Sequence, residues 1–281
     1  MFIEKLKKIK ILKSIVSYII NKYWRIIYKS KYGIPFFDTN NSSKITNPIN
    51  YLKGVKSVAI IGKGASIFEN NPKQVIDECD CRILLSRVDV ENLESYLGNK
   101  FEVQITPMVA DRDSIIQVLP KDLIKKYGIN LLIANLEKSD ERFILFNNYF
   151  QDRVNNVGYK PSSNEMTFDV DIYKYSPKGS LTIASSVLRI LYNISSVEKI
   201  VFAGVDAFHY GYSQKQKIDG KVFLDQNLNF ENPMESHGKP FLNFLFDTVQ
   251  QINKIKKLDV YFPKVLKKHI KFPNSTSFKF Y

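Results

Sequence analysis

Three short stretches of the sequence combine residue types that could bind an anion or move a proton. The first, "IIGKGAS", ends an apolar run with Gly62, Lys63, Gly64 and Ser66. A strand that ends in small residues lets backbone N–H groups approach a phosphate or a ribose. A dinucleotide fingerprint needs a third glycine three residues after the second, but that position is Ile67. The stretch therefore indicates a mononucleotide site or a simple turn.

The second stretch, "SPKGS", places Lys178, Gly179 and Ser180 directly before an apolar helix that is expected over residues 181–192. The free N–H groups and the positive dipole end of a helix N-terminus favour an anion at this position. Ser176 or Ser180 could also serve as an ordinary N-cap, and the two interpretations are compatible. The segment therefore predicts an anion-binding site.

A strand expected from Lys199, "KIVFAGVD", follows this helix and ends in Gly204 and Asp206. It leads to Tyr210 and Tyr212. Tyrosine hydroxyls that arrive beside a helix N-terminus could bind a phosphate without a metal ion.

The third stretch, "NPMESHGKPFLNF", carries His237 between a polar loop and an amphipathic helix. Only three histidines occur in the chain. A general base needs access to solvent and substrate, which a junction of this kind provides. A lone histidine is more often structural than catalytic, so position alone favours a structural role.

These stretches need a scaffold that brings them to one edge, and the sequence supplies alternating strands and helices. Strands are expected over residues 55–61, 82–85, 101–106, 130–135, 199–206 and 258–263. Short apolar strands interleaved with helices predict an α/β fold with a Rossmann-like parallel sheet and helices on both faces. Ligands bind such sheets at the C-terminal ends of the strands, so Thr106 at the end of the third strand joins the predicted binding residues.

The chain divides into three parts by composition. Residues 1–37 are basic and amphipathic, residues 38–54 are rich in Asn and Ser and are expected to form a linker, and residues 55–281 are expected to form the binding domain. Two irregular polar segments of that domain, about residues 152–175 and 210–238, are predicted to be lids over the site.

The net charge of +13 is unevenly distributed along the 281 residues. Residues 1–32 hold eight lysines and one arginine against the single acid Glu4, so a nucleic-acid groove across the whole protein is not favoured. Apolar residues recur there at helical spacing, but the longest uncharged stretch is far shorter than the roughly 20 residues that span a bilayer. We expect a helix that lies on an anionic membrane surface; the alternative is a helix packed on the protein's own domain.

Cysteine and acidic motifs are weak signals for redox or metal chemistry. Cys79 and Cys81 are too close for an ordinary disulfide and have no partner pair at zinc-ligand spacing, which is typical of a reducing cytosol. Two Asp-x-Asp stretches, 111–113 and 169–171, could hold a divalent ion, but such short matches arise easily by chance.

Together, the order and type of these motifs resemble the bacterial sialyltransferases of glycosyltransferase family 42 and, more distantly, the sialyl motifs of family 29. "IIGKGAS" is similar to the family's first strand and nucleotide-binding turn, and "SRVD" is similar to the next motif. "SPKGS" with "VFAGVD" resembles the later turn, helix and strand, and "SHGKPFLNFLFD" matches the segment that carries the catalytic histidine. The resemblance spans roughly residues 57–263.

Three positions depart from the family pattern. Lys63 stands where a nucleotide-binding Asn is usual, and Asp89 replaces another Asn. Phe208 lies where a phosphate-binding Tyr is common, so Tyr210 or Tyr212 would take that role. These departures concern the identity of the donor more than the fold.

The resemblance implies a GT-A-like fold variant and a metal-independent, inverting transfer from a CMP-sugar such as CMP-sialic acid. His237 would act as base, Tyr210 and Tyr212 would stabilise the departing phosphate, and the other named residues would bind the donor, Asp89 included. The expected acceptor is a bacterial surface glycan, lipooligosaccharide or capsule, reached from the cytoplasmic face of the inner membrane; a homo-oligomer is possible. The alternatives are a related enzyme that uses another nucleotide sugar and a non-catalytic nucleotide-binding membrane adaptor.

Overall fold

The computed structural model describes most of the domain that the sequence predicts. The described residues are 44–86, 88, 90–106, 118–150, 152–175, 182–207, 217–218, 221–222, 235, 238–268 and 270–281. The strands are β1 (Lys44–Thr46), β2 (Ser57–Ile61), β3 (Cys81–Leu85), β4 (Val103–Thr106), β5 (Leu131–Ala134), β6 (Asn156–Gly158), β7 (Lys199–Ala203), β8 (Lys217–Ile218), β9 (Lys221–Val222), β10 (Asp259–Phe262) and β11 (Phe278–Phe280). The α-helices are α2 (Pro48–Tyr51), α3 (Ile67–Asn70), α4 (Lys73–Asp77), α5 (Val90–Leu97), α7 (Lys121–Tyr127), α8 (Glu141–Phe150), α9 (Ile183–Tyr192) and α10 (Lys239–Ile252), with 3-10 turns η1 (Ser163–Glu165), η2 (Ile172–Lys174) and η4 (Lys264–Lys268).

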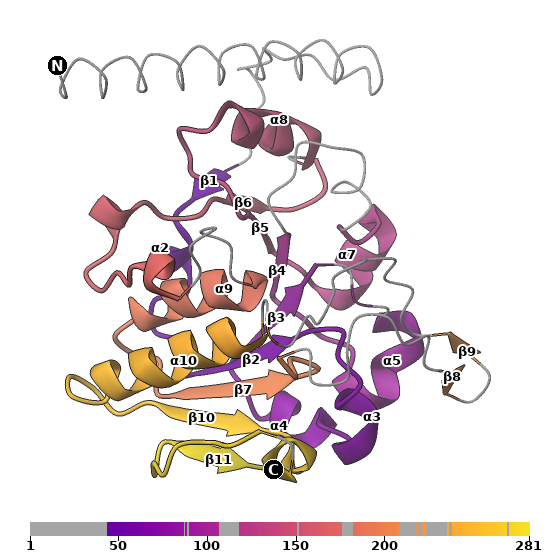
Figure 1. Ribbon diagram of the computed structural model, residues 1–281. Helices are drawn as coiled ribbons and strands as arrows, with labels where there is room; N and C mark the ends of the chain where they lie inside the picture. Colours follow the sequence, from indigo (N-terminus) through magenta and orange to yellow (C-terminus); the bar gives the residue numbers. More distant parts are fainter. Residues whose placement is uncertain are drawn as a thin grey trace, which may run out of the picture.

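Nine of these strands form one parallel sheet in the order β1-β6-β5-β4-β3-β2-β7-β10-β11 (Figure 1). In both β2 and β7 every residue after the first is buried, because helices cover the sheet on both sides. Continuous apolar runs of this kind are typical of central parallel strands. The predicted α/β fold with a Rossmann-like parallel sheet is confirmed.

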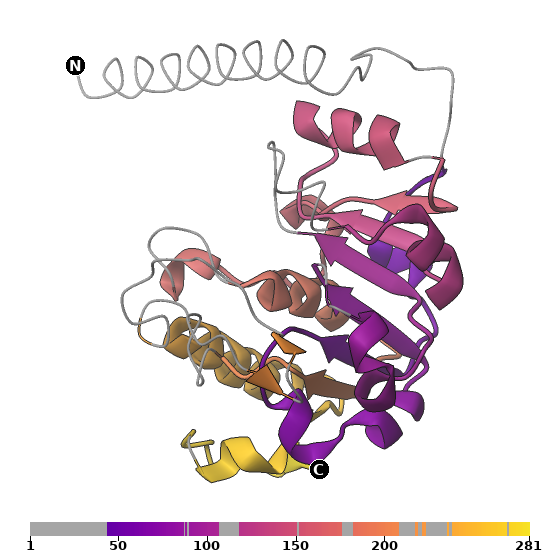
Figure 2. The ribbon, with the colours of Figure 1, turned by 90° about the vertical axis from the view of Figure 1, so that its right-hand side faces the viewer.

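Two apolar cores lie on the two faces of the sheet. One core joins the sheet to α2, α9 and α10, and the other joins it to α3, α4, α5, α7 and α8. Figure 2 shows α9 and α10 on one side of the strands and α3 and α5 on the other. Alternate residues of each strand enter alternate cores, so the face that a residue occupies can be read from its position in the strand.

The order in which the strands are added to the sheet reverses at β2. The chain moves outward from β2 through β3, β4, β5 and β6, and then returns through α9 to β7 on the opposite side of β2. The β2–β7 pair is therefore a topological switch point, where ligands bind beyond the carboxyl ends of the strands in folds of this kind.

Some elements lie where the sequence predicted none. The expected linker, residues 38–54, contains β1 and α2, and β1 pairs with β6 at one edge of the sheet. The expected lid over residues 152–175 contains β6 itself, and β11 extends the opposite edge beyond the last predicted strand. Each of these strands has only three residues, which is too short for an apolar pattern to be visible in sequence.

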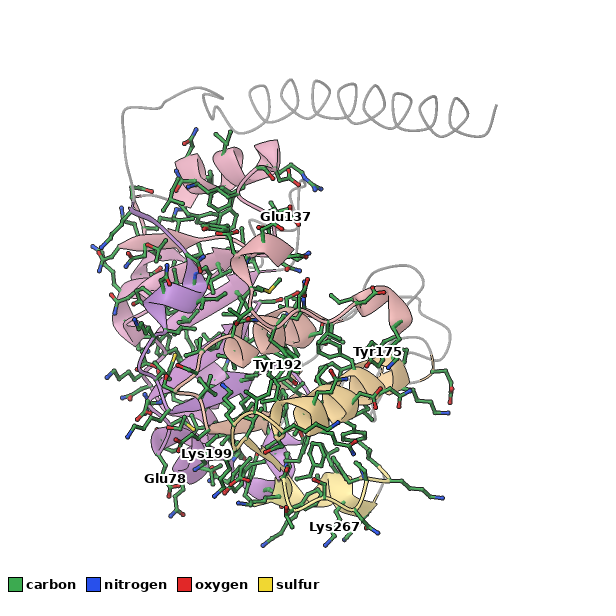
Figure 3. The ribbon with its side chains drawn as sticks, turned by 90° about the vertical axis from the view of Figure 1, so that its left-hand side faces the viewer. Glu78, Glu137, Tyr175, Tyr192, Lys199 and Lys267 are labelled. Carbon is green, nitrogen blue, oxygen red and sulfur yellow. The ribbon has the colours of Figure 1, made fainter. Side chains whose placement is uncertain are left out.

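The remainder of that lid segment packs on α9 and α10. The Asn193 side chain at the end of α9 accepts a hydrogen bond from Phe168 N at 2.7 Å and donates one to Phe168 O at 2.7 Å. The Tyr175 hydroxyl donates to Asp247 of α10 at 3.0 Å, and Tyr175 lies beside α10 in Figure 3. The segment is thus part of the domain wall on the α9 side.

Candidate functional site

The switch point brings two of the predicted turns into contact. β2 and β7 pair in parallel with Ile61 opposite Ala203, so Gly62 and Gly204 leave the sheet side by side. Gly62 N donates to Ala203 O at 2.8 Å, and Gly64 N donates to Gly204 O at 2.7 Å. The turns "GKG" and "GVD" are therefore held together by their backbones.

The glycines of these turns are required by how closely the turns approach each other. A Cβ on Gly62 would lie 2.4 Å from Gly204 O, and a Cβ on Gly204 would lie 2.7 Å from Gly62 O. A Cβ on Gly64 would lie 2.3 Å from an oxygen of the Asp206 carboxyl group, and Gly204 has a φ of +63°. The absence of side chains here is explained by packing between the turns, which leaves their outer surface for a ligand.

Ser66 supplies a hydroxyl group at the same place. Its side chain is 1% exposed, and within the described residues its Oγ has no hydrogen-bond partner. Ser66 is the N-cap of α3, but its side chain makes no capping hydrogen bond. A buried hydroxyl without a partner is unfavourable, so a group that bonds to it would be stabilised.

A residue that the sequence analysis did not identify, Gln104, stabilises the carboxyl ends of β3 and β4. Gln104 lies fully buried in β4; its Nε2 donates to Ser86 O at 2.9 Å, and its Oε1 accepts from Leu119 N at 3.3 Å. Ser86, directly after β3, has a φ of +60°, and its N–H donates to Ile105 O at 2.7 Å. A non-glycine residue in this region of φ is uncommon and is held here by both backbone groups. A polar residue in the middle of an apolar strand, "EVQIT", was the available signal.

Six predicted binding residues gather at the switch point. They are Gly62, Lys63, Gly64, Ser66, Gly204 and Asp206. Asp206 is 7% exposed and Lys63 is half-exposed. Thr106 is buried at the end of β4, two strands from β2 and so about 10 Å away.

The remaining predicted site residues lie outside the described residues. They are the predicted catalytic residues His237, Tyr210 and Tyr212 and the predicted binding residues Asp89, Lys178, Gly179 and Ser180. Residues 1–43, with the predicted membrane-surface helix, and most of the predicted lid over residues 210–238 also lie outside them. Their roles stay predictions.

The acidic motif over residues 169–171 takes part in protein contacts. Asp169 accepts hydrogen bonds from Ser163 Oγ at 2.6 Å and from Arg189 of α9 at 2.5 and 3.0 Å. Burial acts to raise the pKa of Asp169, but these bonds and the guanidinium charge outweigh it and lower that pKa. Within the ranges that the structure describes, no three His, Cys, Asp or Glu side chains are grouped so that they could hold a metal ion. The other motif, residues 111–113, is not described.

The two cysteines are buried thiols. Cys79 and Cys81 form no disulfide, and burial raises the pKa of Cys79 to about 11 and raises that of Cys81 as well. Thiols with raised pKa values are poor nucleophiles, so neither cysteine is a candidate catalytic group.

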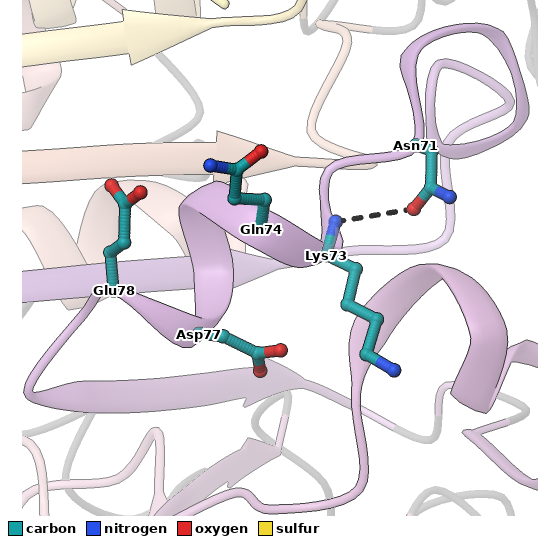
Figure 4. Close-up of a pocket in the computed structure, with 5 residues that line it drawn as sticks. All are labelled: Asn71, Lys73, Gln74, Asp77 and Glu78. Atoms are coloured by element: carbon teal, nitrogen blue, oxygen red, sulfur yellow. Dashed lines mark hydrogen bonds between the residues drawn. The ribbon is translucent and has the colours of Figure 1, made fainter.

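A surface cavity of about 610 Å³ lies along α4 (Figure 4). Its lining residues are Asn71, Lys73, Gln74, Asp77 and Glu78, and Lys73 N donates to Asn71 Oδ1 at 3.4 Å. None of the predicted binding residues lines it. The side chains around this cavity are polar and project from a short helix, so it resembles an open surface hollow more than a ligand site.

No helix in the described part of the chain is both long enough and apolar enough to cross a lipid bilayer.

Comparison with known proteins gives structural neighbours only. No protein-family model matches the sequence, and no curated protein matches it. The structure is similar to that of the sialyltransferase CST-II in complex with trisaccharide acceptor and CMP, with a TM-score of 0.44 and 15% sequence identity over 79% of this chain and 93% of that chain. A ketoreductase domain from the bacillaene assembly line is a weaker match, with a TM-score of 0.20 and 12% identity over 73% of this chain and 43% of that chain.

Proposed function

We propose that this chain is a metal-independent, inverting glycosyltransferase that moves sialic acid or a related sugar acid from a CMP-sugar to a glycan hydroxyl. The observation that carries the proposal is the contact between the turns after β2 and β7 at the switch point, with the buried Ser66 hydroxyl beside them. Such a crevice is where α/β sheets bind nucleotides. The CMP-sugar follows from the sequence resemblance, whose first and third motifs are these two turns.

The proposed reaction transfers a sugar in one displacement. The acceptor hydroxyl oxygen attacks the anomeric carbon, the bond from that carbon to the CMP phosphate breaks, and the hydroxyl proton passes to His237. Tyr210 and Tyr212 donate hydrogen bonds to the departing phosphate. Attack opposite to the leaving group inverts the anomeric centre.

CMP release from CMP-sialic acid in the presence of a glycan acceptor tests this function. We expect release that EDTA does not change and that His237→Ala lowers by roughly 100-fold or more, as expected for a general base. His269→Ala is the matched control and retains activity. Normal turnover by a folded His237→Ala variant would contradict the mechanism.

The departure at Lys63 makes the choice of donor a separate question. The residue lies half-exposed in the turn after β2, where the family pattern has an amide side chain. Donor hydrolysis measured across CMP and UDP sugars distinguishes a sialyltransferase from a related enzyme with another donor. Binding of CMP without hydrolysis or transfer of any donor would favour the non-catalytic alternative.

We also propose that residues 1–32 bring the protein to the cytoplasmic face of the inner membrane. Their excess of lysines and helical apolar spacing suit a surface rich in anionic lipid. Deletion of these residues should release the protein from anionic vesicles and leave donor hydrolysis intact. Unchanged vesicle binding would refute this role.

A further inference from the structure

The carboxyl ends of β5 and β6 place two polar side chains next to each other. Ile133 pairs with Gly158, so two residues further on Asn135 lies opposite Lys160. Lys160 N donates to Leu136 O at 2.7 Å, which continues the alignment of the two chains beyond the strands. Ile133 belongs to the core on the α9 side, and residues two apart in a strand share a face. Asn135 and Lys160 therefore face the α9 side at the carboxyl edge.

Both side chains have unused hydrogen-bonding capacity. Asn135 Oδ1 is buried and accepts no hydrogen bond from any residue that the structure describes. Lys160 is half-buried, and its ammonium group has no hydrogen bond or ion pair within the same residues. Burial, and then the charge of Arg189, lower the pKa of Lys160. A half-buried ammonium without a counter-ion favours an anion in contact with it.

The carboxylates around Lys160 do not meet this requirement. Asp169 is bonded to Arg189 and Ser163, as described above. Glu137, between β5 and α8 in Figure 3, is exposed, and its effect on the pKa of Lys160 is smaller than the opposing effects of burial and Arg189. Neither carboxylate forms an ion pair with the Lys160 ammonium, although both act to raise its pKa, so an external anion would be its first direct partner.

The position of the pair relative to the switch point suggests which part of a ligand reaches it. β5 and β6 are three and four strands from β2, and neighbouring strands are about 4.8 Å apart, so the pair lies about 14 to 19 Å from the glycine turns along the same edge. This distance places the pair beyond the direct reach of the donor nucleotide's phosphate. A glycan that enters along the edge would meet it with a distal sugar.

We propose that Asn135 and Lys160 form a subsite for a carboxylate-bearing sugar of the bound substrate, most directly the acceptor glycan. The Lys160 ammonium pairs with the carboxylate, and Asn135 Oδ1 accepts a hydrogen bond from a hydroxyl of the same sugar. This assignment rests on the proposed glycosyltransferase function and adds a preference for acidic acceptors.

Calorimetric titration of the full chain, in the presence of CMP, with sialyllactose and lactose as probes tests the subsite. We expect the wild type to bind sialyllactose about tenfold more tightly than lactose, because charge-assisted hydrogen bonds are stronger than neutral ones. Lys160→Met should remove this preference, and Lys160→Arg should retain most of it. Lys125→Met is the matched control, since Lys125 is exposed on α7, which covers the opposite face of the sheet.

Titration with CMP-sialic acid and CMP distinguishes the two sources of a sugar carboxylate. If Lys160→Met weakens binding of CMP-sialic acid but not of CMP, the subsite holds and the carboxylate belongs to the donor. If Lys160→Met, shown to be folded by circular dichroism, binds all four probes as the wild type does, the subsite is refuted. A wild-type protein that binds neither CMP nor CMP-sialic acid would instead refute the proposed function. In that case the comparison of sialyllactose with lactose still tests the subsite: a preference for sialyllactose that Lys160→Met removes supports it, and equal binding of the two sugars refutes it.

Discussion

The carboxyl edge of the sheet contains two regions that are built in different ways. At the β2–β7 switch point the backbones of two turns meet directly, and glycine is the residue that fits. At the β5–β6 end the backbones keep the spacing of the strands, and the side chains of Asn135 and Lys160 remain without partners in the described structure. The first region depends on backbone fit, whereas the second provides chemical groups for a ligand.

This difference determines how each region responds to substitution. Where backbones touch, an added methyl group forces the strands apart and affects the whole fold. Where polar side chains lack partners, their removal costs the fold little and affects only what binds. The two regions can therefore be separated by measuring stability and binding on the same variants.

The largest effect on stability is expected for Gly62→Ala. The new Cβ would lie 2.4 Å from Gly204 O, a backbone atom that cannot turn away, so we expect a loss of about 3 kcal/mol in the free energy of unfolding. Urea denaturation measures it. Gly128→Ala is the matched control: its Cβ would enter open space, so only the left-handed backbone, φ +74°, costs about 1 kcal/mol. Equal losses in the two variants would contradict close backbone contact at the switch point.

A smaller loss, about 2 kcal/mol, is expected for Gln104→Leu. The substitution leaves Ser86 O and Leu119 N without their bonds to Gln104 in a buried environment, while the apolar volume is retained. Guanidinium denaturation checks this value. Gln74→Leu on exposed α4 should change stability by less than about 0.5 kcal/mol. If Gln104→Leu is as stable as the wild type, the hydrogen bonds of Gln104 are not needed to hold Ser86 in its left-handed conformation.

The Asp169–Arg189 contact, beside the β5–β6 region, predicts a pH-dependent effect. The pKa of Asp169 is lowered in the folded protein, so its contribution is present above the unfolded value of about 3.9 and is lost as pH falls through the folded value. Asp169→Asn should therefore cost about 1.5 kcal/mol at pH 7 and progressively less below pH 4. Unfolding curves at pH 7 and pH 3 measure the change.

The exposed Asp152, which pairs with Lys121 at 3.2 Å, is the control for that experiment. Asp152→Asn should change stability by less than about 0.5 kcal/mol at pH 7. A difference between Asp169→Asn and wild type that is the same at pH 7 and pH 3 would show that the carboxylate charge is not what stabilises the contact.

The same contrast explains what could be predicted from sequence. The central strands and the turn at Gly62 were predictable because long apolar runs and glycine report local backbone requirements. The edge strands β1, β6 and β11 were not, because three residues show no pattern and their pairing is set by distant chain. Gln104 and the pairing of Asn135 with Lys160 depend on register across strands, which no single segment encodes.

The smallest effect on stability is expected at the switch point itself, from Ser66→Ala. Because the buried hydroxyl has no partner within the described residues, its removal should leave the free energy of unfolding unchanged or raise it by up to about 1 kcal/mol. If the hydroxyl bonds to the nucleotide, the same variant should bind CMP about fivefold more weakly, as measured by calorimetry. Thr248→Val is the control with the opposite expectation for stability and CMP affinity, because the buried Thr248 hydroxyl has a partner: it donates to Phe244 O at 2.6 Å. This variant should lose stability and keep its CMP affinity, and a Ser66→Ala variant that behaves in the same way would assign Ser66 to the fold and not to the ligand.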